Sequence, residues 1–543
     1  MLLGVFAAVL LRLWWVNGWQ AADYVALAQN QRLLTVAERQ FERGDFLDRH
    51  GEALTNRPEK VLLVFPTLLR QDERHSAAYY QTFLAALLQT EGLTPTNNWR
   101  SKLADDKPFV LARGLTDAQA AEIQQRLGGH CGVFVPIYRP RYAENSPLAH
   151  LLGYVGEAEN TGKCGLEQQY DAILQGRPSV QIAAAVDERG RQAADQLRQL
   201  PPGGADEALN VRLTVDYSYQ QICEQAMQGK NGAAVLLDAQ NGDVLAMVSS
   251  PNFDQSVGQP AADGDIYLNK ALAYYPPASV FKIVLAAAAL EEGISLDENI
   301  RPFVCSGSIT LPNGHSVNCW QHSGHGEENL AAALANSCNP YFVALGQKLG
   351  GDKISEYAWR LGLTEQILRG YEVNSANMLD FSSAVPGDVA NVSIGEKGIR
   401  TTPLMIARML AAVANGGKLP EARLVMSLET AGGQTVQNIE SAEPRQVISS
   451  QTAHKLADML RGAVQQGTGR PVNSPIISIG GKTGTSQHFG VWFAGFFPAD
   501  EPRWTMAVYL ADGTSGGGDA GAVCREVAEK LALLEDIAHQ SSV

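Results

Sequence analysis

A serine and a lysine three positions apart, Ser279 and Lys282, are the first residues whose types and spacing could do covalent chemistry. They lie in "YPPASVFKIVLAAAALEEG", where the apolar run from Val280 to Leu290 predicts a helix that ends at Gly293. Residues three apart share a helix face, so the amine would lie beside a hydroxyl at the helix N-terminus, where free N–H groups favour an oxyanion. A neutral lysine there can take the hydroxyl proton. Taken alone, the pair is more often a capping serine followed by a surface lysine.

A second candidate is the tripeptide Ser337-Cys338-Asn339 in "ANSCNPYF". A serine and an amide two residues apart at a helix edge can relay a proton and hold a substrate amide. For the tripeptide alone, a helix-terminal loop without a catalytic role is the simpler interpretation.

A third candidate is Lys482-Thr483-Gly484-Thr485 in "IISIGGKTGTSQ". A phosphate loop is excluded, because that pattern needs a glycine where this chain has Ile476. The following apolar run "HFGVWFAGFFP" predicts a second strand, which makes the segment half of a hairpin. The glycine would let a substrate backbone approach the strand edge. The threonines would offer hydroxyls, and the lysine would offer a positive charge to a carboxylate.

The three motifs follow one another in the order S-x-x-K, S-x-N and K-T-G, which is the set of serine β-lactamases and penicillin-binding proteins. Over nearly its whole length the chain resembles class B penicillin-binding proteins, which are monofunctional peptidoglycan transpeptidases. The stretches that carry this resemblance are "FERGDFLDRHGEAL", "GKCGLEQQYDAILQG", "LTVDYSYQ", "NGDVLAM" and "TTPLMIARMLAAVANGG". One departure is Glu396 in "IGEKG", where the family usually has glutamine, and it concerns a local loop contact.

The elements that position these motifs are those of an α/β (α+β) domain. "VRLTVD" predicts a strand, "YSYQQICEQAMQ" a helix, and "GAAVLLDAQNGDVLAMVSSP" a hairpin that turns at Gln240 to Asp243. With helices in between and the hairpin around Lys482 near the C-terminus, we expect an antiparallel sheet whose first and last strands are adjacent. The resemblance implies that this is a penicillin-binding, serine β-lactamase-like transpeptidase domain.

The N-terminal half contains no catalytic pattern. It mixes a predicted helix in "LTDAQAAEIQQRLG" with a predicted strand in "GGHCGVFVPIYRPRYA". "QLPPGGADEALN" is dense in proline and glycine and predicts a domain boundary. We therefore expect a pedestal (dimerisation-type) domain over residues 21–206 and a transpeptidase domain over residues 207–543.

The composition of the chain argues against one class of partner. The 543 residues are 45% hydrophobic, which is typical of a globular protein. The formal net charge of −14 argues against a nucleic-acid partner.

The N-terminus is an apolar segment. Residues 1–16, "MLLGVFAAVLLRLWWV", are almost all apolar, and no small-residue cleavage site follows. We expect a single-pass membrane anchor over residues 1–20, with the catalytic domain outside the cytoplasm. A buried amphipathic helix is the alternative.

The resemblance implies acyl transfer in two steps. Ser279 attacks the D-Ala-D-Ala carbonyl of a stem peptide, with neutral Lys282 as its base. Ser337 relays a proton to the leaving amine, and Asn339 orients the peptide. An amine of a second stem peptide then takes the acyl group, and no cofactor is needed for catalysis.

The third motif is expected to hold the end of the substrate. Lys482, Thr483 and Thr485 would bind the terminal carboxylate of a stem peptide or of a β-lactam. The backbone N–H groups of Ser279 and Thr485 would form the oxyanion hole.

A cysteine-rich segment lies between the first two motifs. Four residues of the types that zinc prefers occur there: Cys305, Cys319, His325 and Cys338. The segment has little apolar periodicity, and some elongation-type relatives carry metal-ligand residues at matching places. We therefore predict a structural zinc, with His315 and His322 as alternative ligands. A Cys305–Cys319 disulfide remains open, because it is expected outside the cytoplasm.

Two other functions use the same motifs. A β-lactamase would need a group that activates water for deacylation, and the sequence does not exclude one. A β-lactam sensor would need several membrane helices, and this chain has one candidate span. Family resemblance implies a multi-span glycan polymerase as partner, whereas a role in elongation, division or sporulation stays open.

Overall fold

The structure of the protein is a computed structural model. It describes residues 33–35, 43–70, 75–127, 132–138, 141–142, 146–156, 160–175, 182–186, 192–199, 208–255, 265–296, 302–373, 386–486 and 488–541. The expected anchor and most of the proline- and glycine-rich boundary lie outside the described residues. Of the helices that are described, none combines the length and the apolar character needed to cross a membrane.

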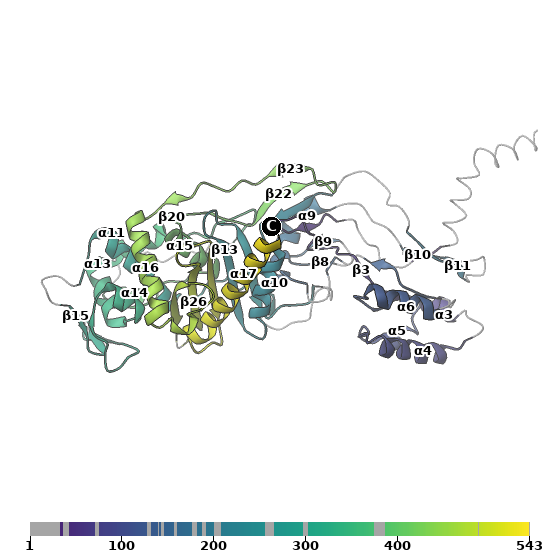
Figure 1. The fold of residues 1–543 in the computed structure, drawn as a ribbon, viewed down its shortest axis with the longest axis horizontal. Helices are drawn as coiled ribbons and strands as arrows, with labels where there is room; N and C mark the ends of the chain where they lie inside the picture. Colours follow the sequence, from purple (N-terminus) through teal and green to yellow (C-terminus); the bar gives the residue numbers. More distant parts are fainter. Residues whose placement is uncertain are drawn as a thin grey trace, which may run out of the picture. The chain divides into compact units, whose positions relative to one another are not determined.

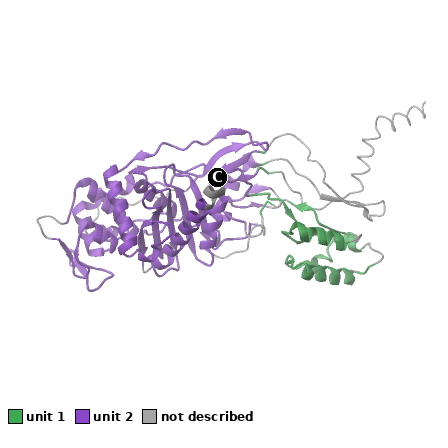
Figure 2. Ribbon diagram, in the orientation of Figure 1, with its two compact units in different colours: residues 1–44, 55–143, 175–208 green, residues 45–54, 144–174, 209–543 purple. Residues whose placement is uncertain are grey.

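The chain forms two compact units, shown in different colours in Figure 2. Unit 1 contains residues 1–44, 55–143 and 175–208, and unit 2 contains residues 45–54, 144–174 and 209–543. This division differs from the sequence expectation, which gave residues 45–54 and 144–174 to the pedestal. The reason is pairing and packing: Phe46 pairs with Val211, and Leu152, Leu166 and Leu174 are fully buried in the core of unit 2.

Unit 1 is a small α/β body. Its elements are β1 (Leu33–Thr35), β3 (Glu59–Lys60), β4 (Leu62–Val64), α3 (Pro66–Arg70), α4 (Ala77–Thr90), α5 (Trp99–Lys102), β5 (Phe109–Ala112), α6 (Asp117–Leu127), β6 (Val133–Phe134), β7 (Ile137–Tyr138), β10 (Ile182–Val186) and β11 (Gln192–Gln199). One sheet has the order β5-β4-β6, and its apolar side chains pack with those of α4 and α6. The helix predicted in this half is α6, whereas the predicted strand after it is two short strands, β6 and β7.

Unit 2 is built around a five-stranded antiparallel sheet. Its strands, in spatial order, are β14 (Val244–Ser250), β13 (Gly232–Asp238), β27 (Trp504–Leu510), β26 (Val491–Phe497) and β25 (Gly480–Thr485). Both predicted hairpins are present, as β13 with β14 and as β25 with β26. Since β13 pairs with β27, the first and last strands of the sheet are adjacent, as the sequence predicted.

Helices cover both faces of this sheet, because its strands point apolar side chains toward each face. Along β13, Ala234 and Leu236 belong to the core that contains α10 (Tyr217–Ala226) and α17 (Gly521–Ser541). Val235 and Leu237 belong to the core on the opposite face. Such alternation follows from the two-residue period of a strand. Figure 1 shows α10 and α17 side by side on their face of the sheet.

The second face is covered by α11 (Lys282–Glu292), α12 (Leu330–Ala335), α13 (Asn339–Arg360), α15 (Pro403–Ala414) and α16 (Ser450–Gln466). Of these helices, α11 and α13 begin with residues of the first two motifs. Helix α16 packs against β25 and α12, and α11 packs against α13. The first two motifs therefore lie on neighbouring helices, close to the edge strand that carries the third.

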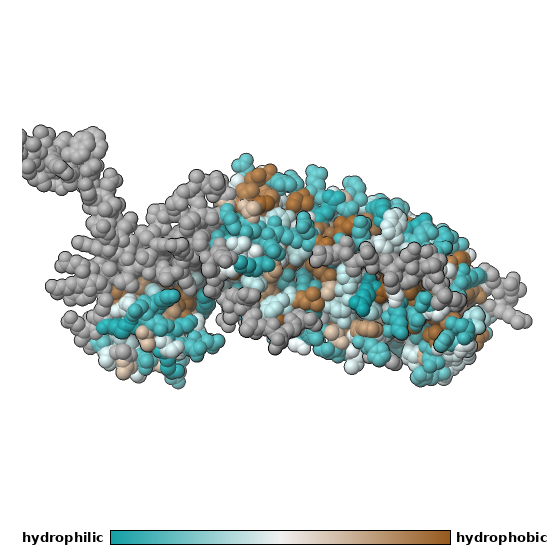
Figure 3. Space-filling model, turned by 180° about the vertical axis from the view of Figure 1, so that it is seen from behind, coloured by the Kyte–Doolittle hydropathy of each residue, from teal (hydrophilic) through white to brown (hydrophobic). Residues whose placement is uncertain are grey.

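Smaller elements surround this core. They are β2 (Phe46–Leu47), α7 (Ala149–Leu152), β8 (Val155–Gly156), β9 (Thr161–Gly162), α8 (Gly165–Gln169), α9 (Asp171–Leu174), β12 (Asn210–Leu213), η2 (Asp265–Tyr267), β15 (Phe303–Cys305), β16 (Ser308–Thr310), β17 (Ser316–Asn318), β18 (Gly326–Glu328), β19 (Leu368–Arg369), α14 (Pro386–Ser393), β20 (Lys418–Leu419), β21 (Ala422–Arg423), β22 (Val425–Glu429), β23 (Thr435–Asn438), β24 (Arg445–Gln446), η5 (Arg470–Val472) and η6 (Gly516–Ala520). The predicted strand "VRLTVD" is β12, which joins β2, β22 and β23 rather than the central sheet. In Figure 3 hydrophilic residues cover much of the coloured surface, with smaller apolar patches between them, as is usual for globular domains.

Candidate active site

Ser279 lies in a tight turn that precedes the helix predicted for the first motif. The turn is the 3-10 segment η3 (Ala278–Phe281), and α11 begins only at Lys282 and ends before Gly293, which has φ 63°. The sequence predicted that the α-helix begins at Val280, two residues earlier than in the structure. The Ser279 side chain is partly exposed, and its hydroxyl has no hydrogen-bond partner among the described residues. It is therefore accessible to a substrate carbonyl.

Lys282 is fully buried beneath this turn. Its Nζ donates to Asn339 Oδ1 at 2.7 Å, to the Ser337 carbonyl oxygen at 2.8 Å and to Ser337 Oγ at 3.3 Å. Burial lowers the pKa of Lys282 to about 7, because water no longer stabilises the charged ammonium. A substantial fraction of this amine is therefore neutral near pH 7, as a general base must be.

Lys482 is the second fully buried lysine of the site. Its Nζ donates to Ser337 Oγ and to the Thr483 carbonyl oxygen, both at 2.9 Å. Burial and the nearby Lys282 charge lower its pKa well below the usual value. From the sequence we expected Lys482 to face a substrate carboxylate. In the structure the amine lies below the surface, and its hydrogen bonds go to Ser337 and Thr483.

Ser337 connects the two lysines from the break between α12 and α13. Its backbone is left-handed, with φ 54°, which is a strained conformation for a residue other than glycine. Cys338 caps α13, and Pro340 occupies the first turn of that helix. Because Ser337 Oγ receives hydrogen bonds from both amines, its own proton is free to point toward a third group.

Gly484 allows the edge strand to approach the turn that carries Ser279. A Cβ atom at this position would lie 3.2 Å from both the Pro277 carbonyl oxygen and Val280 Cγ2. The expected role, room for a substrate backbone, stays a prediction, and the structure adds a contact of β25 with the turn before α11. Because glycine has no side chain, β25 can pack closely against the turn of the first motif at this position.

The two threonines of the third motif differ in exposure. Thr483 is 6% exposed, and its hydroxyl lies 2.7 Å from that of Thr468. Thr485 is exposed, and its Oγ1 accepts from the Gly516 N–H at 3.1 Å. Of the two, Thr485 is the one that is open to a ligand.

Known families match both halves of the chain. Residues 232–529 match the penicillin-binding protein transpeptidase domain, and residues 38–209 match the penicillin-binding protein dimerisation domain. The chain belongs to the class B penicillin-binding proteins. It is a serine-type transpeptidase of the acyl-enzyme class, as the order of its motifs implied.

Curated relatives and solved structures agree with this assignment. Stage V sporulation protein D of Bacillus subtilis is 29% identical, over 90% of this chain and 78% of its own. Peptidoglycan D,D-transpeptidase MrdA of Acinetobacter baumannii is 26% identical, over 88% and 78%. The imipenem acyl-enzyme complex of penicillin-binding protein A from M. tuberculosis is 27% identical, with a TM-score of 0.60 over 74% of this chain and 94% of its own.

Another similar solved structure is titled "Structural coordination of polymerization and crosslinking by a peptidoglycan synthase complex". It is 26% identical to this penicillin-binding protein, with a TM-score of 0.63, and covers 97% of this chain and 96% of its own. The likeness therefore extends through both halves of the chain.

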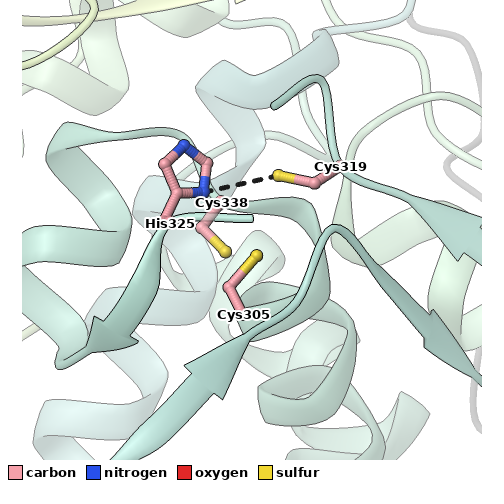
Figure 4. A group of neighbouring side chains, drawn as sticks. All are labelled: Cys305, Cys319, His325 and Cys338. Atoms are coloured by element: carbon pink, nitrogen blue, oxygen red, sulfur yellow. Dashed lines mark hydrogen bonds between the residues drawn. The ribbon is translucent and has the colours of Figure 1, made fainter. Parts of the chain in front are cut away.

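Next to the second motif, this penicillin-binding protein gathers the four residues predicted as zinc ligands. Figure 4 shows Cys305, Cys319, His325 and Cys338 converging from separate segments, and their ligand atoms all lie within 4.8 Å of one another. Cys319 Sγ lies 3.5 Å from His325 Nδ1. All the cysteines that the structure describes are free thiols, so the alternative Cys305–Cys319 disulfide is not formed in it.

The alternative ligands His315 and His322 are exposed and outside this group. The cluster can restrict the position of the second motif, because Cys338 lies directly between Ser337 and Asn339 in the chain. Asn339 Nδ2 also donates to the Asn318 carbonyl oxygen at 3.2 Å, next to Cys319. Any movement of the cluster would therefore reach the side chains that hold Lys282.

Sequence reasoning missed a residue that joins the second and third motifs. The backbone N–H of Thr468 donates to the Ala335 carbonyl oxygen at 3.0 Å, and its hydroxyl contacts that of Thr483. Ala335 ends α12, two residues before Ser337. The only signal in the sequence is a Gly-Thr-Gly turn after a helix, which does not identify its partners.

Proposed function

We propose that this penicillin-binding protein cross-links peptidoglycan stem peptides and that Ser279 carries the acyl group. The observation that most supports these roles is the pair of buried lysine amines sharing the Ser337 hydroxyl, one turn from a serine with a free hydroxyl. Burial lowers the pKa of both amines, and the charge of Lys282 lowers the pKa of Lys482 further. A neutral amine beside a serine is the arrangement that nucleophilic catalysis needs.

In the first step, Ser279 Oγ attacks the carbonyl carbon between two D-alanine residues. Its proton passes to neutral Lys282, and the new C–O bond forms as the carbonyl becomes an oxyanion. The Ser279 and Thr485 N–H groups would stabilise that oxyanion. The C–N bond then breaks, and D-alanine leaves as an amine that must gain a proton.

Ser337 is the natural donor of that proton. Its hydroxyl lies between Lys282 and Lys482, so a proton given to the leaving amine is replaced from one of the lysines. Lys482 acts through Ser337, and exposed Thr485 is the better candidate to touch the substrate carboxylate. Asn339, whose Oδ1 accepts from Lys282, fixes the orientation of that amine.

In the second step, an amine of another stem peptide attacks the ester carbon of acylated Ser279. A C–N bond forms, the C–O bond breaks, and Ser279 regains a proton. A β-lactam would stop the cycle after acylation, since its leaving amine stays attached to the acyl group. Acylation by fluorescent penicillin tests the first step. Release of a cross-linked dimer from two stem peptides tests the second.

We also propose that Cys305, Cys319, His325 and Cys338 hold a structural zinc ion. Three thiols and one imidazole are a donor set that suits tetrahedral zinc. The imidazole already points one ring nitrogen at the thiols, because His325 Nδ1 lies 3.5 Å from Cys319 Sγ and within 4.8 Å of the other ligand atoms. The ion would fix the Ser337–Asn339 segment and would take no part in the acyl transfer.

Membrane attachment and a partner enzyme complete the proposal. The apolar residues 1–16 support a single-pass anchor that leaves the transpeptidase outside the cytoplasm. The similar structure of a peptidoglycan synthase complex supports a multi-span glycan polymerase as partner. Co-purification of the full-length protein with a candidate polymerase in detergent, and loss of that complex without residues 1–20, tests both points.

A further inference from the structure

Glu396 lies against the turn that carries the nucleophile. The Gly395 carbonyl oxygen accepts from the Ala278 N–H at 3.0 Å, one residue before Ser279. Gly395 has φ 73°, and a Cβ atom there would lie 2.0 Å from the Ala278 carbonyl oxygen. Only glycine fits this contact, so the position of the next residue, Glu396, is fixed relative to the turn.

The carboxylate of Glu396 is held at one oxygen and free at the other. Oε2 accepts from the hydroxyl of Ser486 at 3.0 Å, directly after strand β25. Ser486 is 7% exposed, whereas Glu396 is partly open to solvent. Oε1 has no partner among the described residues. Ser486 therefore orients this partly exposed carboxylate between the Ser279 turn and the end of β25.

This carboxylate changes the electrostatics of a site that otherwise holds two buried lysines. Its charge is close enough to Lys282 to raise the pKa of that amine, against the larger lowering by burial. The acceptor of the second step is a primary amine, which is an ammonium ion at neutral pH. Lys282 or Lys482, when protonated, repels such an ion, and a nearby carboxylate attracts it.

We propose that Glu396, held by Ser486, binds the ammonium group of the acceptor stem peptide and so determines acceptor specificity. This inference rests on the proposed transpeptidase function and concerns its second step alone. No bond to Glu396 forms or breaks. Its role is to bring a cation to the acylated Ser279, where the same group, after losing a proton, attacks the ester.

A near-isosteric change tests this role. Glu396→Gln keeps the size of the side chain and an oxygen for the hydrogen bond with Ser486 but removes the charge. The acyl-enzyme is formed from a D-alanyl thioester donor and is offered two acceptors. One is the tripeptide L-Ala-D-isoglutamyl-L-Lys, whose side-chain amine is protonated, and the other is methanol, which is neutral.

The variant is expected to lose about tenfold or more in the rate of aminolysis at low peptide concentration, seen as a higher KM for the peptide. The rates of methanolysis and of β-lactam acylation should fall by less than about threefold. Glu501→Gln, which removes the same charge from an exposed turn between β26 and β27, is the matched control and should alter none of these rates.

The possible outcomes distinguish the role of Glu396 from the proposed transpeptidase function. Equal losses with peptide and methanol, or no loss with either, would overturn the role of Glu396 while leaving the transpeptidase intact. A wild-type protein that forms neither an acyl-enzyme nor a peptide product would instead overturn the proposed function. Ser486→Ala frees the carboxylate and is expected to raise the KM for the peptide in the same direction, by a smaller factor.

Discussion

At the level of single residues, the proposed chemistry depends on two lysine amines whose pKa is lowered by burial. The order of the motifs predicted one site containing Ser279, Lys282, Ser337 and Lys482, and hydrogen bonds join the last three in the structure. The direction in which Lys482 points was not predictable. It depends on Ser337, which is 145 residues away and is held in a left-handed conformation.

The pH dependence of acylation follows from the lowered pKa of Lys282. Below about pH 7 this amine is protonated and takes no proton from Ser279, so the acylation rate should fall about tenfold for each further pH unit. Above pH 8 the rate should level off. Stopped-flow measurements with a fluorescent penicillin between pH 5.5 and 9 give the profile. A rate that stays flat across this range would contradict a basic role for Lys282.

Replacing Lys282 by arginine tests the same role at fixed pH. A guanidinium stays protonated at every relevant pH, so Lys282→Arg should lower the acylation rate at least a hundredfold. Lys455→Arg, on the exposed face of α16, provides the control for a lysine-to-arginine change and should acylate normally. Similar rates for Lys282→Arg and Lys455→Arg would remove Lys282 from the mechanism.

At the level of elements, the site is the meeting point of η3, α11, the α12–α13 break and β25. The two hairpins were predictable from apolar runs and turn residues, and the adjacency of the first and last strands was predictable from the order of strands and helices along the domain. The packing of β25 on η3 was not, because it depends on a contact between Gly484 and Pro277 that no local pattern encodes.

Adding a methyl group at Gly484 should separate these two elements. Its Cβ would lie 3.1 Å from Trp492 Cβ on β26 and 3.2 Å from the Pro277 carbonyl oxygen, tighter than ordinary contacts, so β25 is pushed away from the turn that carries Ser279. We expect Gly484→Ala to lower the acylation rate at least tenfold with only a small change in Tm. Gly432→Ala, where the nearest atom is 3.8 Å away, should leave both unchanged. An active Gly484→Ala would contradict the positioning role.

The cysteine and histidine cluster gives a second prediction at this level. The purified transpeptidase should contain about one equivalent of zinc, and a chelator should lower its Tm because metal binding contributes to folding. Cys305→Ser should lose the metal and part of the stability, whereas Cys524→Ser, which changes a buried thiol outside the cluster, should keep the metal. A metal-free protein with a Cys305–Cys319 disulfide by mass would overturn the zinc proposal.

At the level of the whole molecule, unit 2, which contains the transpeptidase domain, includes two segments from the N-terminal half of the chain. The boundary expected near residue 206 followed composition, which reports where a linker lies but not which distant segments pack together. Residues 45–54 and 144–174 join unit 2 through β2 and through buried leucines. Such non-local contacts are set by tertiary packing, and a single sequence gives no signal for them.

A buried leucine from these segments should therefore stabilise the catalytic unit. Leu166 is 0% exposed in the core of unit 2, so Leu166→Ala should cost about 2–5 kcal/mol of unfolding free energy. Thermal unfolding followed by loss of penicillin binding measures this. Leu533→Ala, on a residue that is 51% exposed, should cost much less. An equal, small effect of both changes would contradict the assignment of residues 144–174 to this unit.

The central claim is that Ser279 carries the acyl group, and intact mass spectrometry of the full-length protein after penicillin exposure tests it most directly. We expect a single, long-lived adduct of one penicillin mass, mapped by digestion to the peptide that contains Ser279. Ser279→Ala should show no adduct while keeping the Tm of the wild type. An adduct that survives in Ser279→Ala, or one that maps to another residue in the wild type, would contradict the account.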